Sequence, residues 1–297
     1  MVLGVFFVVE VVGGVLTNSL ALISDAAHLL TDVAAVALAL VAQWFAAKPG
    51  DSARSFGYRR VEIVAAQING LTLILVAVYI GYEAWQRFSA PPEVLSWPMI
   101  AVASVGLVAQ LITAVVLGRA QGESLNVRGA YVHAMTDAVQ SVGVVGVGLL
   151  MAFTGWYIAD PIVSVLIGLL IAYSGGKILW EATHVLIEGT PRELDLDEIA
   201  AVMRAVPGVV RVTDLHAWSL TSGYNALSAH VEASPDLQHE GYDVLRRHLT
   251  EDISSRFSVQ HVTLQVERGC DLCRSGCCAW LEQPPADGTS LQGGSSS

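Results

Sequence analysis

Six apolar segments, separated by short polar connections, occupy the first two thirds of the chain. They fall at roughly residues 1–16, 20–46, 60–86, 98–118, 128–153 and 160–187. A helix needs about 20 predominantly apolar residues to cross the hydrocarbon core of a bilayer, and only the first segment is short of that length. The segments therefore predict an α-helical membrane protein with six transmembrane helices.

The chain after Pro191 has a different character. The whole sequence is 53% hydrophobic and only 14% charged, and the charge concentrates in this last third. Apolar residues alternate with polar ones in strand-like segments, as Leu227, Ala229 and Val231 do with Ser228 and His230. The predicted order is helix 195–205, strand 209–218, strand 225–233, helix 240–256 and strand 260–267. This αββαβ order predicts a cytoplasmic, ferredoxin-like α+β domain.

These patterns divide the chain into three parts. Residues 1–188 form the predicted membrane domain, residues 189–268 the cytoplasmic domain, and residues 269–297 a cysteine-containing tail that we expect to be partly disordered. The tail ends in Gly-Gly-Ser-Ser-Ser, a composition typical of flexible segments.

Basic residues indicate how the spans are oriented. They gather in the connections after the second and fourth segments: Lys48, Arg54, Arg59, Arg60, Arg119 and Arg128. The positive-inside rule then places both termini in the cytoplasm, in a plasma or bacterial inner membrane. No cleavable signal peptide is evident at Met1. The net charge of −11 and the missing basic stripe argue against nucleic acid as a partner.

Two matching pairs of polar residues lie inside the apolar segments. His28 and Asp32 are four residues apart, as are His133 and Asp137, so each pair projects from one helix face. Ionisable groups are costly in a membrane and are usually functional there. The second and fifth segments run in opposite directions, so the two pairs can meet near mid-membrane. Two imidazoles and two carboxylates suit a tetrahedral divalent ion, most naturally zinc; the alternative is hydrogen bonding between helices.

Other polar residues in the spans have less specific interpretations. Asp25 shares a helix face with His28 and either orients its imidazole or lines an outer vestibule. Asn69 and Gln140 fit packing or pore lining, and Asp160, before a proline, fits a helix cap. Glu10 has no role that the sequence assigns.

The predicted cytoplasmic domain carries three histidines, one on each strand. His216, His230 and His261 all fall on the polar face of the predicted sheet, where they form either a metal site or solvated side chains. Asp214 shares this face and is a weaker candidate. Cys270 and Cys273 have half the spacing of a thiolate zinc site. In a reducing cytosol they favour metal over a disulfide, with a further ligand from the sheet or a second protomer.

Taken together, the motifs resemble the cation diffusion facilitator family of zinc, cadmium and cobalt exporters. The matching stretches are residues 18–32, 56–63, 133–137, 188–191 and 214–223, the last being Asp-Leu-His-Ala-Trp-Ser-Leu-Thr-Ser-Gly. The resemblance implies six helices, a cytoplasmic metal-binding and dimerisation domain, and a homodimer. It implies that His28, Asp32, His133 and Asp137 form the transport site, and that the cytoplasmic histidines bind regulatory metal.

Details of the resemblance refine the expected substrate. A histidine opens both motifs, as in the zinc-preferring members, which favours Zn²⁺ over Cd²⁺ or Co²⁺. Two features depart from the family pattern: an N-terminal cytoplasmic arm is not seen, and no histidine lies between Gly118 and Gly129. We therefore expect no capture of zinc by that connection.

The expected function is zinc/proton antiport by alternating access, with Zn²⁺ and H⁺ exchanged at the four intramembrane ligands. An enzyme is the first alternative. Intramembrane zinc proteases carry a general base beside the metal, typically in His-Glu-x-x-His, and this sequence has no such motif. Four protein ligands would also leave no position for catalytic water. The second alternative is a membrane-anchored zinc sensor that transports nothing.

Overall fold

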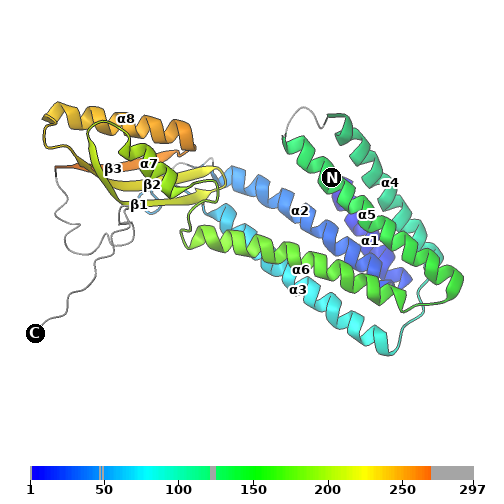
Figure 1. Ribbon diagram of the computed structural model, residues 1–297. Coiled ribbons are helices and arrows are strands. Elements are labelled where there is room, and N and C mark those ends of the chain that lie inside the picture. Colours follow the sequence, from blue (N-terminus) through cyan, green and yellow to red (C-terminus); the bar gives the residue numbers. More distant parts are fainter. Residues whose placement is uncertain (1, 47, 49, 121–124, 269–297) are drawn as a thin grey trace, which may run out of the picture. The chain divides into compact units, whose positions relative to one another are not determined.

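Six helices form the first part of the computed structural model, which describes residues 2–46, 48, 50–120 and 125–268 (Figure 1). They are α1 (Val2–Thr17), α2 (Leu20–Ala46), α3 (Val61–Ser89), α4 (Ser96–Ala120), α5 (Leu125–Thr154) and α6 (Ala159–Leu186). Each lies within a few residues of its predicted segment, so the helical membrane domain is confirmed. In the described residues, α3 to α6 are long and apolar enough to span a membrane, and α1 and the start of α2 form shorter apolar helices.

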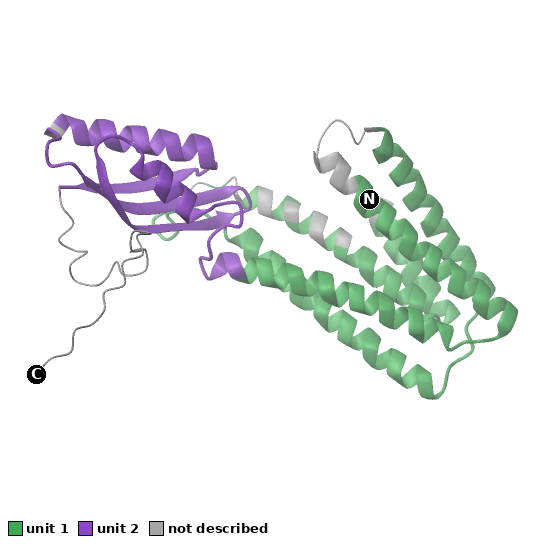
Figure 2. Ribbon diagram, viewed as in Figure 1, with its two compact units in different colours: residues 1–183 green, residues 184–297 purple. Residues whose placement is uncertain are grey.

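The chain divides into two compact units, residues 1–183 and 184–297 (Figure 2). The predicted domain boundaries at 188/189 and 268/269 stay a proposal, and the predicted tail lies outside the described residues.

Close helix contacts in the first unit depend on small residues. On α1, a methyl group at Gly13 would lie 2.9 Å from Val102 of α4, and one at Gly14 would lie 2.6 Å from Ile23 of α2. Such backbone approach is typical of membrane helices, where packing replaces the hydrophobic effect as the driving force. The helix α1 is therefore held between α2 and α4.

In its described residues, the second unit contains a three-stranded sheet and two complete helices. In chain order these are α7 (Leu196–Arg204), β1 (Val209–Thr221), β2 (Tyr224–Ala233), α8 (His239–Phe257) and β3 (His261–Glu267). The sheet order is β1-β2-β3, with β1 antiparallel and β3 parallel to β2. The predicted αββαβ order is confirmed.

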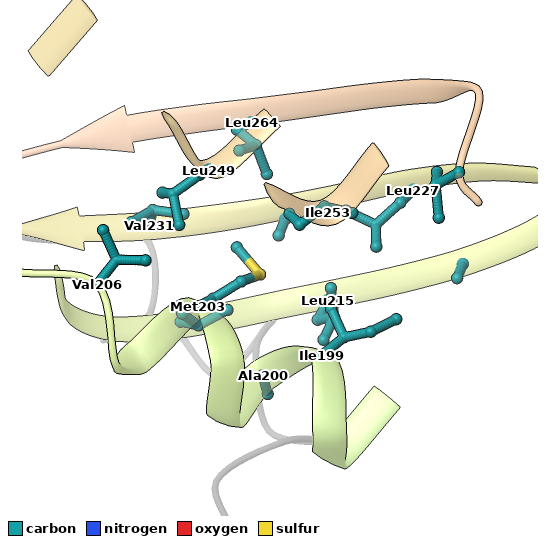
Figure 3. Packing of buried hydrophobic residues seen from close by; sticks show 14 of the residues in the cluster. Ile199, Ala200, Met203, Val206, Leu215, Leu227, Val231, Leu249, Ile253 and Leu264 are labelled. Atoms are coloured by element: carbon teal, nitrogen blue, oxygen red, sulfur yellow. The ribbon is translucent and has the colours of Figure 1, made fainter. Parts of the chain in front are cut away.

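Both helices of this unit pack on one face of the sheet. Ile199 and Met203 of α7 and Leu249 and Ile253 of α8 are fully buried in a core with Leu227 (Figure 3). Because side chains alternate along a strand, the polar residues next to Leu227 and to the other buried strand residues point to the opposite face of the sheet. That face carries the candidate residues of the cytoplasmic domain.

Candidate metal centre

Two helices supply the intramembrane candidate site. His28 lies on α2, and His133 and Asp137 lie one turn apart on α5. The Nε2 atom of His28 is 3.2 Å from Oδ1 of Asp137, and Nε2 of His133 is 3.7 Å from Oδ2 of the same carboxylate. The two imidazole rings have centroids 6.3 Å apart. Both imidazoles thus approach the carboxylate of Asp137, so three of the four predicted ligands are neighbours.

One of these distances matches the ligand separation in a zinc site. Zinc binds histidine nitrogen and carboxylate oxygen at about 2.0 to 2.1 Å, so neighbouring ligands of a tetrahedral ion lie about 3.3 Å apart. The separation of His28 and Asp137 is 3.2 Å. Among the described residues, however, no three His, Cys, Asp or Glu side chains are placed to hold a metal ion as they stand, so metal binding by these groups stays a prediction.

The fourth predicted ligand, Asp32, belongs to α2 one turn after His28. Its side chain lies outside the described part of the structure, so the complete ligand set remains a prediction. Asp137 is buried, whereas the side chain of His133 is 53% exposed. The site therefore sits at the edge of the helix bundle, and one ligand is accessible from outside it.

Asp25 makes a second link between the same helices. Its Oδ1 accepts a hydrogen bond from Gln140 Nε2 at 2.9 Å, and its Oδ2 accepts one from Ser141 Oγ at 3.3 Å. Asp25 precedes His28 by about one turn on α2, and Gln140 follows Asp137 by about one turn on α5. The two links therefore pair the helices in antiparallel fashion. The sequence indicated Asp25 and Gln140 separately, but gave no sign that they bind each other.

A β-bulge shapes the candidate site of the cytoplasmic unit. The β1–β2 register shifts between Thr213 and His216, and Asp214 has a left-handed backbone with φ of 52°. A bulge redirects a side chain that regular alternation would place elsewhere. Here it brings the Asp214 carboxylate between two histidines: Oδ1 lies 3.0 Å from His216 Nε2 and Oδ2 lies 3.7 Å from His230 Nε2.

A second carboxylate reaches the same cluster. Oε1 of Glu267, at the end of β3, lies 3.8 Å from Nδ1 of His230. Glu267 belongs to no motif of the sequence, although two-residue alternation from His261 places it on the polar face. The strand register brings Glu267 close to His230. Gln265 pairs with His230, and Glu267 follows two positions later on the same face, where it pairs with Glu232.

His261 does not join this cluster. His261 is at the start of β3 and pairs with Ala226 of β2. The β3 residue that pairs with His230 is Gln265, four positions later. Four residues of strand span about 13 Å, too far for one ion to bind both side chains in a single protomer. Cys270 and Cys273, the other predicted ligands, lie outside the described residues.

Two family models match the chain. The cation efflux transmembrane domain matches residues 1–187, and the cytoplasmic domain of cation efflux proteins matches residues 191–269.

Curated relatives match along most of the chain. The metal cation efflux system protein CzcD of Cupriavidus metallidurans is 45% identical over 264 residues, covering 89% of this chain and 83% of its own length. The cadmium, cobalt and zinc/H(+)-K(+) antiporter of Bacillus subtilis is 39% identical, with 88% and 85% covered. The zinc transporter ZitB of Escherichia coli is 36% identical, with 88% and 83% covered.

A solved structure also matches the cytoplasmic part. It is the metal-bound C-terminal domain of the CzcD transporter, 35% identical, with a TM-score of 0.23, covering 25% of this chain and 99% of that one.

Proposed function

The chain belongs to the cation efflux family, the cation diffusion facilitators, and from that premise we propose that it exports divalent metal ions from the cytoplasm in exchange for protons. Zn²⁺ is the preferred substrate, with Cd²⁺ and Co²⁺ as further candidates. The relatives named above as a metal cation efflux protein, an antiporter and a zinc transporter support this proposal.

The observation that carries the proposal is the hydrogen bond between His28 and Asp137. A hydrogen bond between an imidazole nitrogen and a carboxylate oxygen holds one proton, whereas a metal ion needs the lone pairs of both atoms. Zinc can bind both groups only after that proton leaves the shared position, and the proton goes to solvent when Nδ1 of His28 is protonated as well, because a neutral imidazole can instead keep its proton on Nδ1. Conversely, a proton arriving between them competes with the metal, which is the exchange that an antiporter requires.

The membrane potential acts on this exchange according to its stoichiometry. A gradient of one pH unit supplies about 1.4 kcal/mol for each proton that moves down it. A membrane potential of 100 mV changes the free energy of transport by about 2.3 kcal/mol for each net charge that crosses the membrane. Exchange of one Zn²⁺ for two protons moves no net charge, so it responds to the pH gradient alone. Any other ratio makes transport sensitive to voltage.

The test is zinc flux in proteoliposomes with an imposed pH gradient and the potential clamped at zero. We expect the gradient to drive zinc against its own concentration difference, and Asp137→Asn to abolish this flux. Thr136→Ala is the matched control, since Thr136 is exposed and its hydroxyl donates a hydrogen bond to the backbone oxygen of Val132 on its own helix. Zinc flux that ignores the pH gradient would contradict the exchange.

We further propose that the protein works as a homodimer with both termini in the cytoplasm. The cluster of Asp214, His216, His230 and Glu267 would bind regulatory metal and favour the transport-competent arrangement. The match to the cytoplasmic domain of cation efflux proteins supports this role.

The competing function is a membrane-anchored zinc sensor, for which the same cytoplasmic cluster would suffice. Asp32→Ala separates the two functions. Loss of the wild-type flux with retained folding favours the transporter, and a wild-type flux no greater than that of protein-free liposomes favours the sensor.

A further inference from the structure

Glu10 is the one ionisable residue of α1, and it is buried inside the helix bundle. Only 1% of its surface is exposed. Neither carboxyl oxygen has a hydrogen-bond partner among the residues that the structure describes. An unpartnered buried carboxylate is strongly unfavourable, and ionisable groups are costly inside a membrane. The transport site described above makes no use of this residue.

The neighbouring helices make room for the carboxyl group without neutralising a charge on it. A methyl group at Gly106 of α4 would lie 2.6 Å from Oε1 of Glu10, so glycine at this position leaves the carboxyl group its space in the conformation described. The only ionisable residue of α4 is Arg119, near its far end. No cation from α4 therefore faces Glu10.

The same face of α4 carries another polar group. Gln110 follows Gly106 by one turn, and its Oε1 is buried without a hydrogen-bond partner among the described residues. The seam between α1 and α4 is therefore polar at two successive turns.

The titratable group that acts on Glu10 from α2 is Asp25, with which it interacts electrostatically. Glu10 lies two turns before the end of α1, and Asp25 lies just over one turn after the start of α2, so the helical hairpin brings them to similar depth. Both oxygens of Asp25 already accept hydrogen bonds from α5, which stabilises a negative charge on Asp25. A second negative charge beside it is unfavourable.

We propose that Glu10 is a proton-binding residue of the transport cycle, separate from the four metal ligands. This rests on the proposed proton exchange. Glu10 holds one proton as a neutral carboxylic acid in the conformation described here. When the bundle rearranges and water reaches the α1–α4 seam, the carboxyl O–H bond breaks, the proton passes to water, and a carboxylate remains. The return step forms the O–H bond again with a proton from water.

The test compares the wild-type protein with Glu10→Gln and Glu10→Asp in proteoliposomes, with zinc and proton fluxes recorded together. Glutamine has the shape of a protonated glutamate but cannot release a proton. We expect Glu10→Gln to fold, to bind zinc with wild-type affinity, and to exchange one proton fewer per zinc ion. Glu10→Asp should restore the ratio at least in part. An unchanged ratio in Glu10→Gln, or a variant that fails to fold or to bind zinc, would overturn the proposal.

A measurement that needs no transport separates this proposal from the proposed function. The infrared spectrum of the detergent-solubilised protein should contain the C=O band of a protonated carboxyl group that is missing in Glu10→Gln. Gly106→Ala should shift this band, because its methyl group pushes on Oε1, whereas Gly143→Ala, which meets no atom within 4 Å, should not. If the wild-type protein moves zinc without protons, the exchange fails whatever the spectrum shows. If the band is equal in wild type and Glu10→Gln, the assignment of Glu10 fails whatever the flux.

Discussion

Asp160 of α6 accepts a hydrogen bond from the backbone N–H of Leu20, with 2.8 Å between Oδ2 and the nitrogen, so one helix caps the N-terminus of another. Its Oδ1 also accepts hydrogen bonds from the hydroxyl of Ser19 and the N–H of Ala21. A carboxylate at this position satisfies free N–H groups and complements the helix dipole. The sequence suggested a cap for Asp160, but the helix that it caps is α2 and lies more than 130 residues away in the chain.

Removing this carboxylate should destabilise the membrane unit. In Asp160→Ala, three donors at the start of α2 lose their acceptor, and Arg87, 3.6 Å from Oδ2, loses a buried partner. We expect the free energy of unfolding in lipid bicelles to fall by about 3 kcal/mol or more. Glu83→Gln is the control, because it alters a half-buried pair with the same Arg87 and should cost less than about 1 kcal/mol. Equal losses in the two variants would contradict the capping role.

Two glycines of α3 should respond in opposite ways to alanine. A methyl group at Gly70 would lie 2.9 Å from the backbone oxygen of Gly175 and 2.9 Å from the backbone nitrogen of Leu179, both on α6, whereas Gly81 has open space around it. Gly70→Ala should therefore separate α3 from α6 and cost about 1 to 3 kcal/mol of unfolding free energy. Gly81→Ala should be neutral or stabilising by up to about 1 kcal/mol. Unfolding in bicelles measures both, and a harmless Gly70→Ala would show that the two helices can move apart freely.

Asp137 should matter more for metal affinity than any other described ligand, since its carboxylate approaches both histidines. We expect Asp137→Ala to weaken zinc binding at the intramembrane site by about 100-fold or more. His133→Ala should retain the contact between His28 and Asp137 and therefore lose less. Titration calorimetry on solubilised protein carrying His230→Ala, which removes the cytoplasmic site, measures this binding. A larger effect of His133→Ala would mean that the carboxylate is not the central ligand.

The two strand histidines of the cytoplasmic unit should differ sharply. His230 contacts Asp214 and Glu267, whereas His261 hydrogen-bonds Thr263 at the other end of the face. In full-length protein carrying Asp137→Ala, a further His230→Ala should abolish the remaining zinc binding, and His261→Ala should preserve it. Equilibrium dialysis with counted zinc checks this outcome. Loss of binding in His261→Ala would instead indicate a site completed by a second protomer.

Much of the candidate site follows from spacing along single elements. The four-residue interval of His133 and Asp137 places both side chains on one face of α5, because a helix repeats every 3.6 residues. Two-residue alternation likewise put His230 on the polar face of its strand. These are local properties of the backbone, so the sequence alone predicted them, together with the order of six helices and an αββαβ domain.

The partners of these side chains were decided by tertiary structure. Only helix packing brings Asp25 to Gln140 and Asp160 to Leu20, because such contacts depend on which helices are neighbours and at what height. The parallel register of β3 on β2 selects Glu267, rather than His261, as a neighbour of His230, and the bulge in β1 places Asp214 beside the same imidazole. The sequence thus determined what each helix and strand offers on its faces. Packing determined which faces meet, since close approach depends on the shapes of residues far apart in the chain.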